Sequence, residues 1–243
     1  MRTQKALKLS PYFVYGVILW EENKMNSKTK KIATIGVLIA LGVILTLIKV
    51  YQLPYGGAIT LGGMVPVVIL GYKYGVKWGL FSGLIFSVIQ MILGAAMSQA
   101  FAGMYDPEHV AASVGKIIAM ALLDYIIAFT AVGLSGMFKG KIKNETLAVA
   151  AGGGTAVFLR FVTHFISGVL LWGSYAEWFF TEVMVNETGK SILSKYSGVG
   201  LAAIYSFIYN GSFMIPEIII TVFVVTILMA VRPLRHLITD ENA

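Results

Sequence analysis

The sequence predicts an all-α integral membrane protein with six transmembrane helices. Of its 243 residues, 57% are hydrophobic and only 13% are charged, and the mean hydropathy is +0.79. A soluble domain usually carries about a quarter charged residues, so this chain has too little polar surface to cover a water-soluble globule. A spanning helix needs about 20 apolar residues, so the length leaves room for roughly six or seven spans and for no separate ATPase domain.

Residues 1–31 are polar and basic around one short apolar run at 12–20. That run is too short to cross a bilayer, and no small-residue cleavage site follows it, as a signal peptide would require. We expect this segment to be an N-terminal extension that is disordered or lies at the membrane interface. The membrane domain then occupies residues 32–235, and residues 236–243 form a cytoplasmic tail.

Six predominantly apolar runs are the predicted spans. They cover residues 32–48, 63–72, 78–97, 117–138, 148–172 and 199–231. The stretch 51–63 is also uncharged, but its proline and glycines predict a loop that leads into a short second helix. The sixth run is long and is interrupted by Pro216.

The basic residues lie unevenly on the two sides of this arrangement. Six spans put both termini on one side, which carries eleven lysines and arginines, whereas the other side carries four. The positive-inside rule places the richer side in the cytoplasm. We therefore expect a multi-pass plasma-membrane protein with cytoplasmic termini and with the loops 98–116 and 173–198 outside. The same rule explains the net charge of +7 without a nucleic-acid partner.

The residue inventory argues against several kinds of chemistry. The chain has no cysteine and contains neither a GxxxxGK[ST] phosphate loop nor an HExxH zinc motif. One histidine lies in the predicted spans without a carboxylate pair, so a metal site or acid–base pair is hard to assemble. We predict no cofactor, no metal and no catalytic residue, and hence no enzyme. The alternatives are an intramembrane enzyme or proton pathway and a stand-alone secondary transporter, although no convincing internal repeat supports the latter.

Five ionisable or amide side chains lie inside apolar spans. They are Asp124, Arg160, His164, Asn210 and Glu217. An ionisable group in the bilayer interior costs on the order of a few kcal/mol, so such residues tend to face partners, cavities or functional sites. Asp124 is about two helical turns from the outer end of its span. Its carboxylate needs compensation from a cationic ligand, from His164 or from the backbone.

The fifth span carries Arg160, His164, Gly168 and Trp172 at intervals of four residues. Residues at this spacing share one face of a helix. Gly168 leaves space between His164 and Trp172 where a ligand could lie. Helix packing at the glycine and interfacial anchoring by the tryptophan would explain the same pattern.

The outer half of the sixth span adds Tyr205 and Asn210. A buried asparagine either joins helices through hydrogen bonds or holds a polar ligand. Aromatic rings with polar tips suit a flat heterocycle, and a cationic heterocycle gains cation–π attraction as well. Together with Asp124, these residue types indicate a site for a small, flat and polar molecule.

Two other pairs have structural or docking interpretations. Arg160 and Glu217 lie at a similar depth in their spans, which predicts a structural ion pair. Gly36 and Ala40 form a small-xxx-small pattern in the first span, which permits close approach of another helix.

Three segments together resemble the thiamine-specific S component of energy-coupling factor (ECF) transporters. They are LLDYIIAF (122–129), LRFVTHFISGVLLWGSY (159–175) and YSFIYNGSFMIP (205–216). The resemblance implies the S-component fold, a six-helix membrane protein that binds thiamine from outside with high affinity. It also implies association with a transmembrane coupling subunit and two ATPase subunits. An S component for another vitamin or a thiamine precursor is the nearest alternative.

The resemblance also assigns roles to individual residues. The ligand-binding set that it implies is Asp124, Tyr125, His164, Gly168, Trp172, Tyr205 and Asn210. Gly36 and Ala40 correspond to the surface that docks on the coupling subunit. The family often has an aromatic lid after the first helix, for which Tyr51 or Tyr55 is the candidate here. A glutamate is familiar at the position of Asp124, so the shorter side chain implies a shifted ligand or a bridging water.

Overall fold

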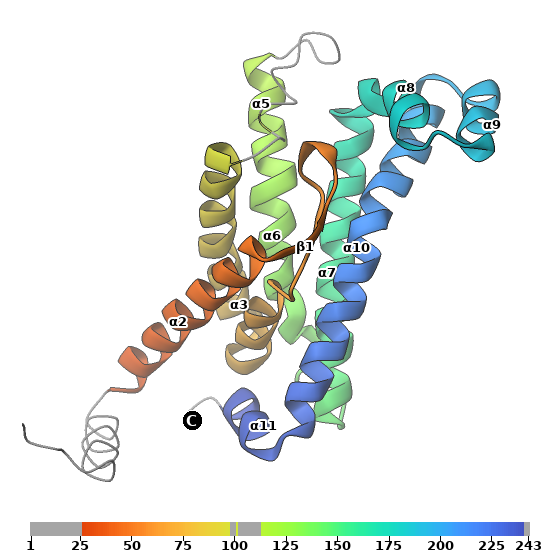
Figure 1. Ribbon diagram of the computed structural model, residues 1–243. Helices are drawn as coiled ribbons and strands as arrows, with labels where there is room; N and C mark the ends of the chain where they lie inside the picture. Colours follow the sequence, from red (N-terminus) through yellow and green to blue (C-terminus); the bar gives the residue numbers. More distant parts are fainter. Residues whose placement is uncertain (1–25, 98–100, 102–112, 241–243) are drawn as a thin grey trace, which may run out of the picture.

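The computed structural model describes residues 26–97, 101 and 113–240, which form a bundle of tilted helices (Figure 1). Five of the described helices are long and apolar enough to cross a membrane. They are Ser27–Leu47, Val65–Ala96, Val114–Phe138, Glu145–Leu170 and Gly198–Ala230. The predicted class, a helical protein with several membrane spans, is confirmed.

The elements are described here in chain order. The first half contains α2 (Ser27–Leu47), β1 (Lys49–Gln52), β2 (Ala58–Thr60) and α3 (Val65–Met97). A composite rod follows, made of α5 (Val114–Met120), a π-helical segment (Ala121–Ile127), α6 (Ala128–Ala131) and a 3-10 segment (Val132–Phe138). The second half contains α7 (Glu145–Leu170), α8 (Ala176–Trp178), α9 (Glu187–Lys195), α10 (Gly198–Ala230) and α11 (Arg232–Thr239).

Asparagine side chains cap α2 and α7, and each of these helices begins before its apolar run. Asn26 accepts a hydrogen bond from the N–H of Lys28 at 3.1 Å, and Asn144 accepts one from the N–H of Leu147 at 3.0 Å. Such caps satisfy N–H groups that have no partner within the helix. Helices α2 and α7 therefore begin in polar sequence, before the apolar spans predicted from hydropathy.

Helix α3 reverses direction at Gly75. The φ angle of Gly75 is 79°, in the left-handed region that favours glycine. A Cβ atom added to Gly79 would lie 2.6 Å from the Cα of Gly71. Eight residues of a straight helix would span about 12 Å, so the arms before and after Gly75 must run antiparallel. These two arms take the place of the second and third predicted spans.

The reversed helix packs against the 3-10 segment through glycines. A Cβ atom on Gly133 would lie 2.1 Å from the carbonyl oxygen of Gly79, and one on Gly136 would lie 2.1 Å from that of Gly71. Small residues allow helix backbones to approach this closely inside a membrane. The two arms of α3 and the composite rod thus form one tightly packed half of the bundle.

Residues 49–60 form a β-hairpin where the sequence predicts part of a loop. Strands β1 and β2 pair antiparallel, with Gln52 opposite Ala58 and Lys49 opposite Thr60. At the turn, the N–H of Leu53 donates to the carbonyl of Gly57 at 2.6 Å. Strands of four and three residues are too short to produce a recognisable alternation of hydrophobic and polar residues. Figure 1 shows this hairpin between α2 and the pair α7 and α10.

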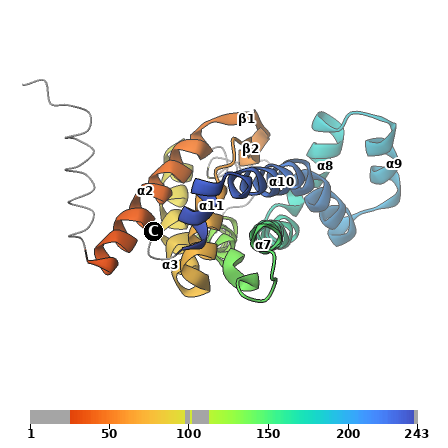
Figure 2. The same ribbon diagram turned by 90° about the horizontal axis from the view of Figure 1, so that it is seen from below.

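Helices α7 and α10 pack along each other and form the other half of the bundle, seen end-on in Figure 2. Above them, α8 and α9 belong to a helical cap whose buried side chains are largely aromatic. The cap and the adjacent helix ends bury Met120, Trp172, Tyr175, Phe179, Phe180 and Tyr205 in one cluster. The predicted outer loop 173–198 is therefore mostly helical, whereas 98–100 and 102–112 of the other outer loop lie outside the described residues.

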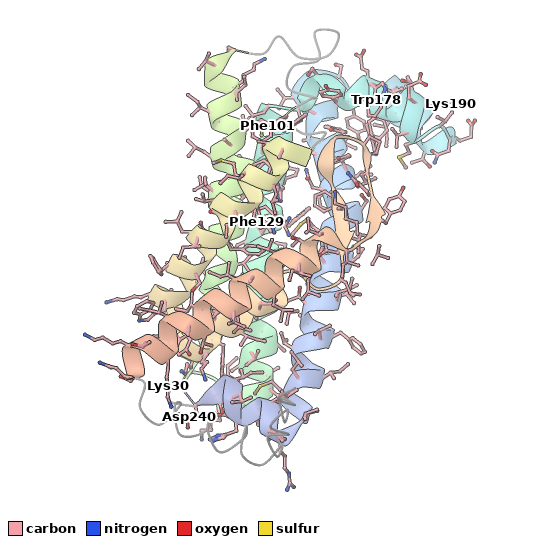
Figure 3. All side chains as sticks on the ribbon, turned by 60° about the vertical axis from the view of Figure 1, so that its left-hand side comes forward. Lys30, Phe101, Phe129, Trp178, Lys190 and Asp240 are labelled. Atoms are coloured by element: carbon pink, nitrogen blue, oxygen red, sulfur yellow. The ribbon has the colours of Figure 1, made fainter. Side chains whose placement is uncertain are left out.

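At the opposite end of the bundle, lysine side chains connect separate segments by donating hydrogen bonds to backbone carbonyls. The Nζ of Lys73 donates to the carbonyl of Leu237 at 2.5 Å and to that of Asp240 at 2.6 Å, and Lys139 Nζ donates to the carbonyl of Lys73 at 2.7 Å. Residues 236–240, predicted as a tail, are thus packed onto the turn of α3. Figure 3 shows Lys30 and Asp240 at this end and Trp178 and Lys190 at the other.

We expect Gly133→Ala to lower the free energy of unfolding by about 1–3 kcal/mol, because the new methyl group meets the backbone of Gly79. Thermal unfolding of the purified protein in detergent measures this change. Gly36→Ala is the matched control, since a Cβ atom there meets nothing within 4 Å. Equal unfolding temperatures for the two variants would contradict the packing described here.

Candidate ligand-binding site

A cavity lies between the hairpin, α3, the π-helical segment, α7 and α10. Seven of the eight predicted ligand-binding residues line it. They are Asp124, Tyr125, His164, Gly168, Trp172, Tyr205 and Asn210. The eighth is Tyr55, whose side chain lies outside the described part of the structure. The other lid candidate, Tyr51, is an exposed residue of β1 and is not part of the cavity wall.

Asp124 is the centre of the polar wall. Its Oδ1 lies 3.2 Å from Nδ1 of His164, and its Oδ2 accepts a hydrogen bond from Nε1 of Trp172 at 3.0 Å. The π-helical segment carries the carboxylate towards His164 on α7 and towards Trp172 in the turn that follows α7. Of the compensating groups considered for Asp124, the structure thus supplies His164. Asp124 also lines the cavity, and its side chain is partly buried.

Gly168 is required for the contact between α7 and α10. A Cβ atom there would lie 2.1 Å from Oγ of Ser206 and 3.0 Å from Nδ2 of Asn210. The Nδ2 group of Asn210 donates to the carbonyls of His164 (3.2 Å) and Ser206 (3.0 Å). These bonds hold the amide nitrogen against the helix backbones, so the side-chain oxygen of Asn210 is the atom left for a ligand.

Aromatic rings form a continuous series along α10. The ring centroids of Phe179 and Tyr205 are 5.3 Å apart, those of Tyr205 and Tyr209 are 5.6 Å apart, and those of Tyr209 and Phe213 are 6.0 Å apart. On the opposite wall, Tyr125 stacks on Phe129, which Figure 3 places near the middle of the bundle. The cavity therefore offers ring faces on two sides of a carboxylate, an arrangement suited to a flat cation.

Several lining residues are not in the predicted ligand-binding set. Tyr209 accepts a hydrogen bond from the N–H of Gly57 at 3.2 Å and donates to the carbonyl of Pro54, so it fastens the hairpin turn to α10. Its position four residues after Tyr205 was a usable signal, because the two share a helical face. Gln90, whose Nε2 donates to Oγ1 of Thr46 at 2.7 Å, is an amide in an apolar span and was detectable in the same way.

Arg160 and Glu217 do not form the predicted ion pair. Oε1 of Glu217 instead accepts hydrogen bonds from the N–H and the hydroxyl of Thr60. The guanidinium of Arg160 lies over the ring of Phe129, 4.1 Å from its centroid. Similar depth on two helices does not make their side chains face each other. Both residues nevertheless line the same cavity as Asp124 and His164.

The predicted docking pair lies away from this cavity. Gly36 and Ala40 are exposed on α2, whereas Ile35 and Ile39 on the same helix are buried. One face of α2 therefore packs on the bundle and the small residues point outward. No group of three or more metal-binding side chains occurs within residues 26–97, 101 and 113–240.

The sequence model of the family described as thiamine transporter protein (Thia_YuaJ) matches residues 32–107 and 108–181. These ranges make up more than half of the chain and include Asp124, His164 and Trp172. The chain belongs to this family. Its membership confirms the resemblance carried by the three sequence segments, and it makes the protein a transporter and not an enzyme.

Two thiamine transporter family members named ThiT are similar over most of their length. The chain is 28% identical over 222 residues to ThiT of Bacillus subtilis (strain 168), which covers 87% of this chain and 95% of that protein. It is 24% identical over 192 residues to ThiT of Lacticaseibacillus paracasei, covering 74% and 78%. A solved structure of ThiT from Listeria monocytogenes has the same fold, with a TM-score of 0.58 at 18% identity over 86% of this chain and 97% of that one.

In this thiamine transporter family member, we expect Tyr209→Phe to loosen the hairpin turn while the helices stay folded. Loss of the hydroxyl removes the acceptor for the N–H of Gly57, so amide hydrogen exchange in residues 53–58 should accelerate about fivefold, as for one lost hydrogen bond. Tyr51→Phe is the control, because that side chain is 57% exposed. Unchanged exchange in Tyr209→Phe would mean that the hydroxyl does not hold the turn.

Proposed function

We propose that this protein is the thiamine-binding S component of an ECF-type vitamin importer, which captures thiamine with high affinity from outside the cell. One observation carries the proposal. The carboxylate of Asp124, positioned by His164 and Trp172, lies in a cavity with aromatic rings on both sides. Thiamine has a flat aminopyrimidine ring and a permanently charged thiazolium ring. A carboxylate, an amide oxygen and ring faces are the groups that would complement both parts.

Asp124 is the group that we expect to meet the polar edge or the charge of thiamine. Oδ2 accepts a hydrogen bond from Trp172 and Oδ1 contacts Nδ1 of His164, so the carboxylate is positioned before a ligand arrives. The family resemblance implies a glutamate at this position, and the side chain of Asp124 is shorter by one methylene group. Thiamine in this protein is therefore expected closer to His164 and Trp172, or joined to Asp124 by a water molecule.

The arrangement in the membrane follows from the reversal of α3. If each arm of α3 counts as one span, the chain has six spans and both termini lie on one side. The side of the termini carries eleven lysines and arginines, and by the positive-inside rule this supports a cytoplasmic location in the plasma membrane for the Lys30 end of Figure 3. The aromatic cap and the hairpin would then face the outside, where thiamine enters.

The proposed partners are a transmembrane coupling subunit and two ATPase subunits. The chain contains no GxxxxGK[ST] motif, and the family resemblance implies that the ATPase subunits are separate proteins. The exposed face of α2 contains Gly36, Ala40 and apolar neighbours such as Val37 and Ile44. Small residues on an exposed membrane helix allow a partner helix to approach closely, which supports this face as the docking surface.

The decisive experiment is titration of the purified protein with thiamine by calorimetry or tryptophan fluorescence. Competition with the pyrimidine half of thiamine and with riboflavin tests the alternative vitamins. Binding of thiamine in strong preference to both supports the proposal. Preference for either competitor would assign the site to another vitamin or precursor.

Trp172→Ala and Asp124→Asn should each weaken thiamine binding at least about tenfold, as expected when a hydrogen bond to a charged group is lost. An asparagine is neutral, so it carries no charge for the thiazolium. Trp78→Ala, outside the cavity, is the control for loss of an indole. Unchanged affinity in both variants would contradict the proposal that Asp124 and Trp172 bind thiamine.

Gly36→Leu and Ala40→Leu should leave thiamine binding intact and impair uptake by cells that supply the coupling and ATPase subunits. The leucine side chain would block a helix that docks on α2. Val37→Leu, a change of one methylene on the same exposed face, is the control. Loss of binding in the glycine and alanine variants would instead place these residues in the fold or the pocket.

A further inference from the structure

Helix α11 lies beneath the bundle, beside the turn of α3 (Figure 1 and Figure 2). The residue before it, Val231, is extended, with a φ angle of −86° and a ψ angle of 109°, so the chain changes direction between α10 and α11. The hydrogen bonds of Lys73 to the carbonyls of Leu237 and Asp240 fasten the far end of α11 to the α3 turn. Helix α11 is therefore held at the surface where the bundle ends.

This helix is amphipathic. Leu234, Leu237 and Ile238 share one face at the three- and four-residue spacing of a helix, and Arg232 and His236 lie on the other. Ile238 is 5% exposed and packs into the core of the bundle, but Leu234 is 37% exposed and Leu237 is 51% exposed. The protein thus covers only part of the apolar face.

The side chains around α11 are mostly basic. Lys31 and Lys139 both contact the α3 turn, so the start of α2 and the segment before α7 lie at the same end of the bundle. The exposed basic residues at this end are Lys28, Lys77, Lys141, Lys143, Arg232 and Arg235. Among the described residues, the acidic side chains here are Glu145 and Asp240. A surplus of positive charge therefore surrounds an exposed apolar helix face.

We infer that α11 is an interfacial helix that binds the head groups of anionic phospholipids. Helices of this kind lie in the plane of the membrane surface, with apolar side chains at the acyl boundary and basic ones among the head groups. Leu234 and Leu237 supply the apolar contacts, and Arg232 and the neighbouring lysines attract phosphate. A zwitterionic surface would accept the leucines equally well, but it would gain little from the clustered positive charge.

Continuity with the lipid-facing surface favours lipid over a protein partner. Helix α10 is long and apolar enough to cross the membrane and ends at Ala230. Ile227 in its last turn is 47% exposed and Val231 after it is 44% exposed. The apolar surface of α10 thus continues up to α11, which begins where the chain leaves the hydrocarbon. The inference goes beyond thiamine binding and does not depend on it.

The chain has no cysteine, so one introduced cysteine provides a unique labelling site. The full-length Leu237→Cys protein, labelled with bimane, is reconstituted into bilayers of phosphatidylcholine with a minor fraction of phosphatidylglycerol. Bromine atoms, which quench bimane on contact, are placed on the acyl chains of one lipid or the other at equal molar fraction. The overall lipid composition stays the same, so the ratio of the two quenching values measures which lipid is enriched beside α11. Leu234→Cys gives a second probe position.

We expect brominated phosphatidylglycerol to quench at least about twofold more strongly than brominated phosphatidylcholine, because basic side chains attract an anionic lipid. Arg232→Gln combined with Lys141→Gln removes two exposed charges near α11 and should bring this ratio close to that of equal quenching. The matched control is Lys190→Gln combined with Lys195→Gln, which removes two exposed charges from α9 at the other end of the bundle. It should keep the preference for phosphatidylglycerol.

Three results would overturn the inference. Equal quenching by the two lipids in the protein with its native charges would mean that α11 has no preference for anionic lipid, and this comparison decides even if the charge variants do not fold. Bimane emission typical of water, with little quenching by either lipid, would assign the exposed face to solvent or to a partner protein. An unchanged preference in the Arg232 and Lys141 variant would show that these charges do not bind the lipid. Because thiamine is absent from these measurements, failure of the proposed function is a separate result.

Discussion

The hydrogen bonds of Asp124 are the interaction on which the site depends. A carboxylate at this depth has little water to solvate it, so its oxygens must find donors within the protein. His164 on α7 and Trp172 in the turn that follows α7 supply these contacts. The same contacts join the composite rod, which carries Asp124, to the other half of the bundle. The cavity is consequently bounded by two halves that meet at a polar contact.

The two halves are held internally by different means. Glycines allow the arms of α3 to lie directly on the 3-10 segment, with backbone against backbone. The other half is held by the long contact of α7 with α10, where Gly168 admits Ser206 and Asn210. The hairpin is joined to the second half through Tyr209 and Glu217 on α10. Residues from every part of this framework thus contribute to one cavity wall.

Sequence patterns predicted the parts of this structure that depend on a single helix. The four-residue spacing of Arg160, His164 and Gly168 placed these residues on one face of α7, and hydropathy located that helix. Trp172 was expected on the same helix, but α7 ends at Leu170 and Trp172 lies in the turn that follows. The hairpin was not predictable, because Gly57 and Thr60 acquire partners only when α10 lies beside them. The expected pair of Arg160 and Glu217 failed for a related reason. Hydropathy reports depth in the membrane and contains no information on the direction in which a side chain points.

The contact of Lys73 has a consequence for the order in which the chain folds. Lys73 is only 3% exposed, and its recorded acceptors are carbonyls of Leu237 and Asp240, more than 160 residues later. During synthesis the α3 turn leaves the ribosome long before those carbonyls exist. Until residues 237–240 have emerged, its ammonium group lacks these two acceptors. The α3 turn therefore completes its native contacts late in the synthesis of the protein.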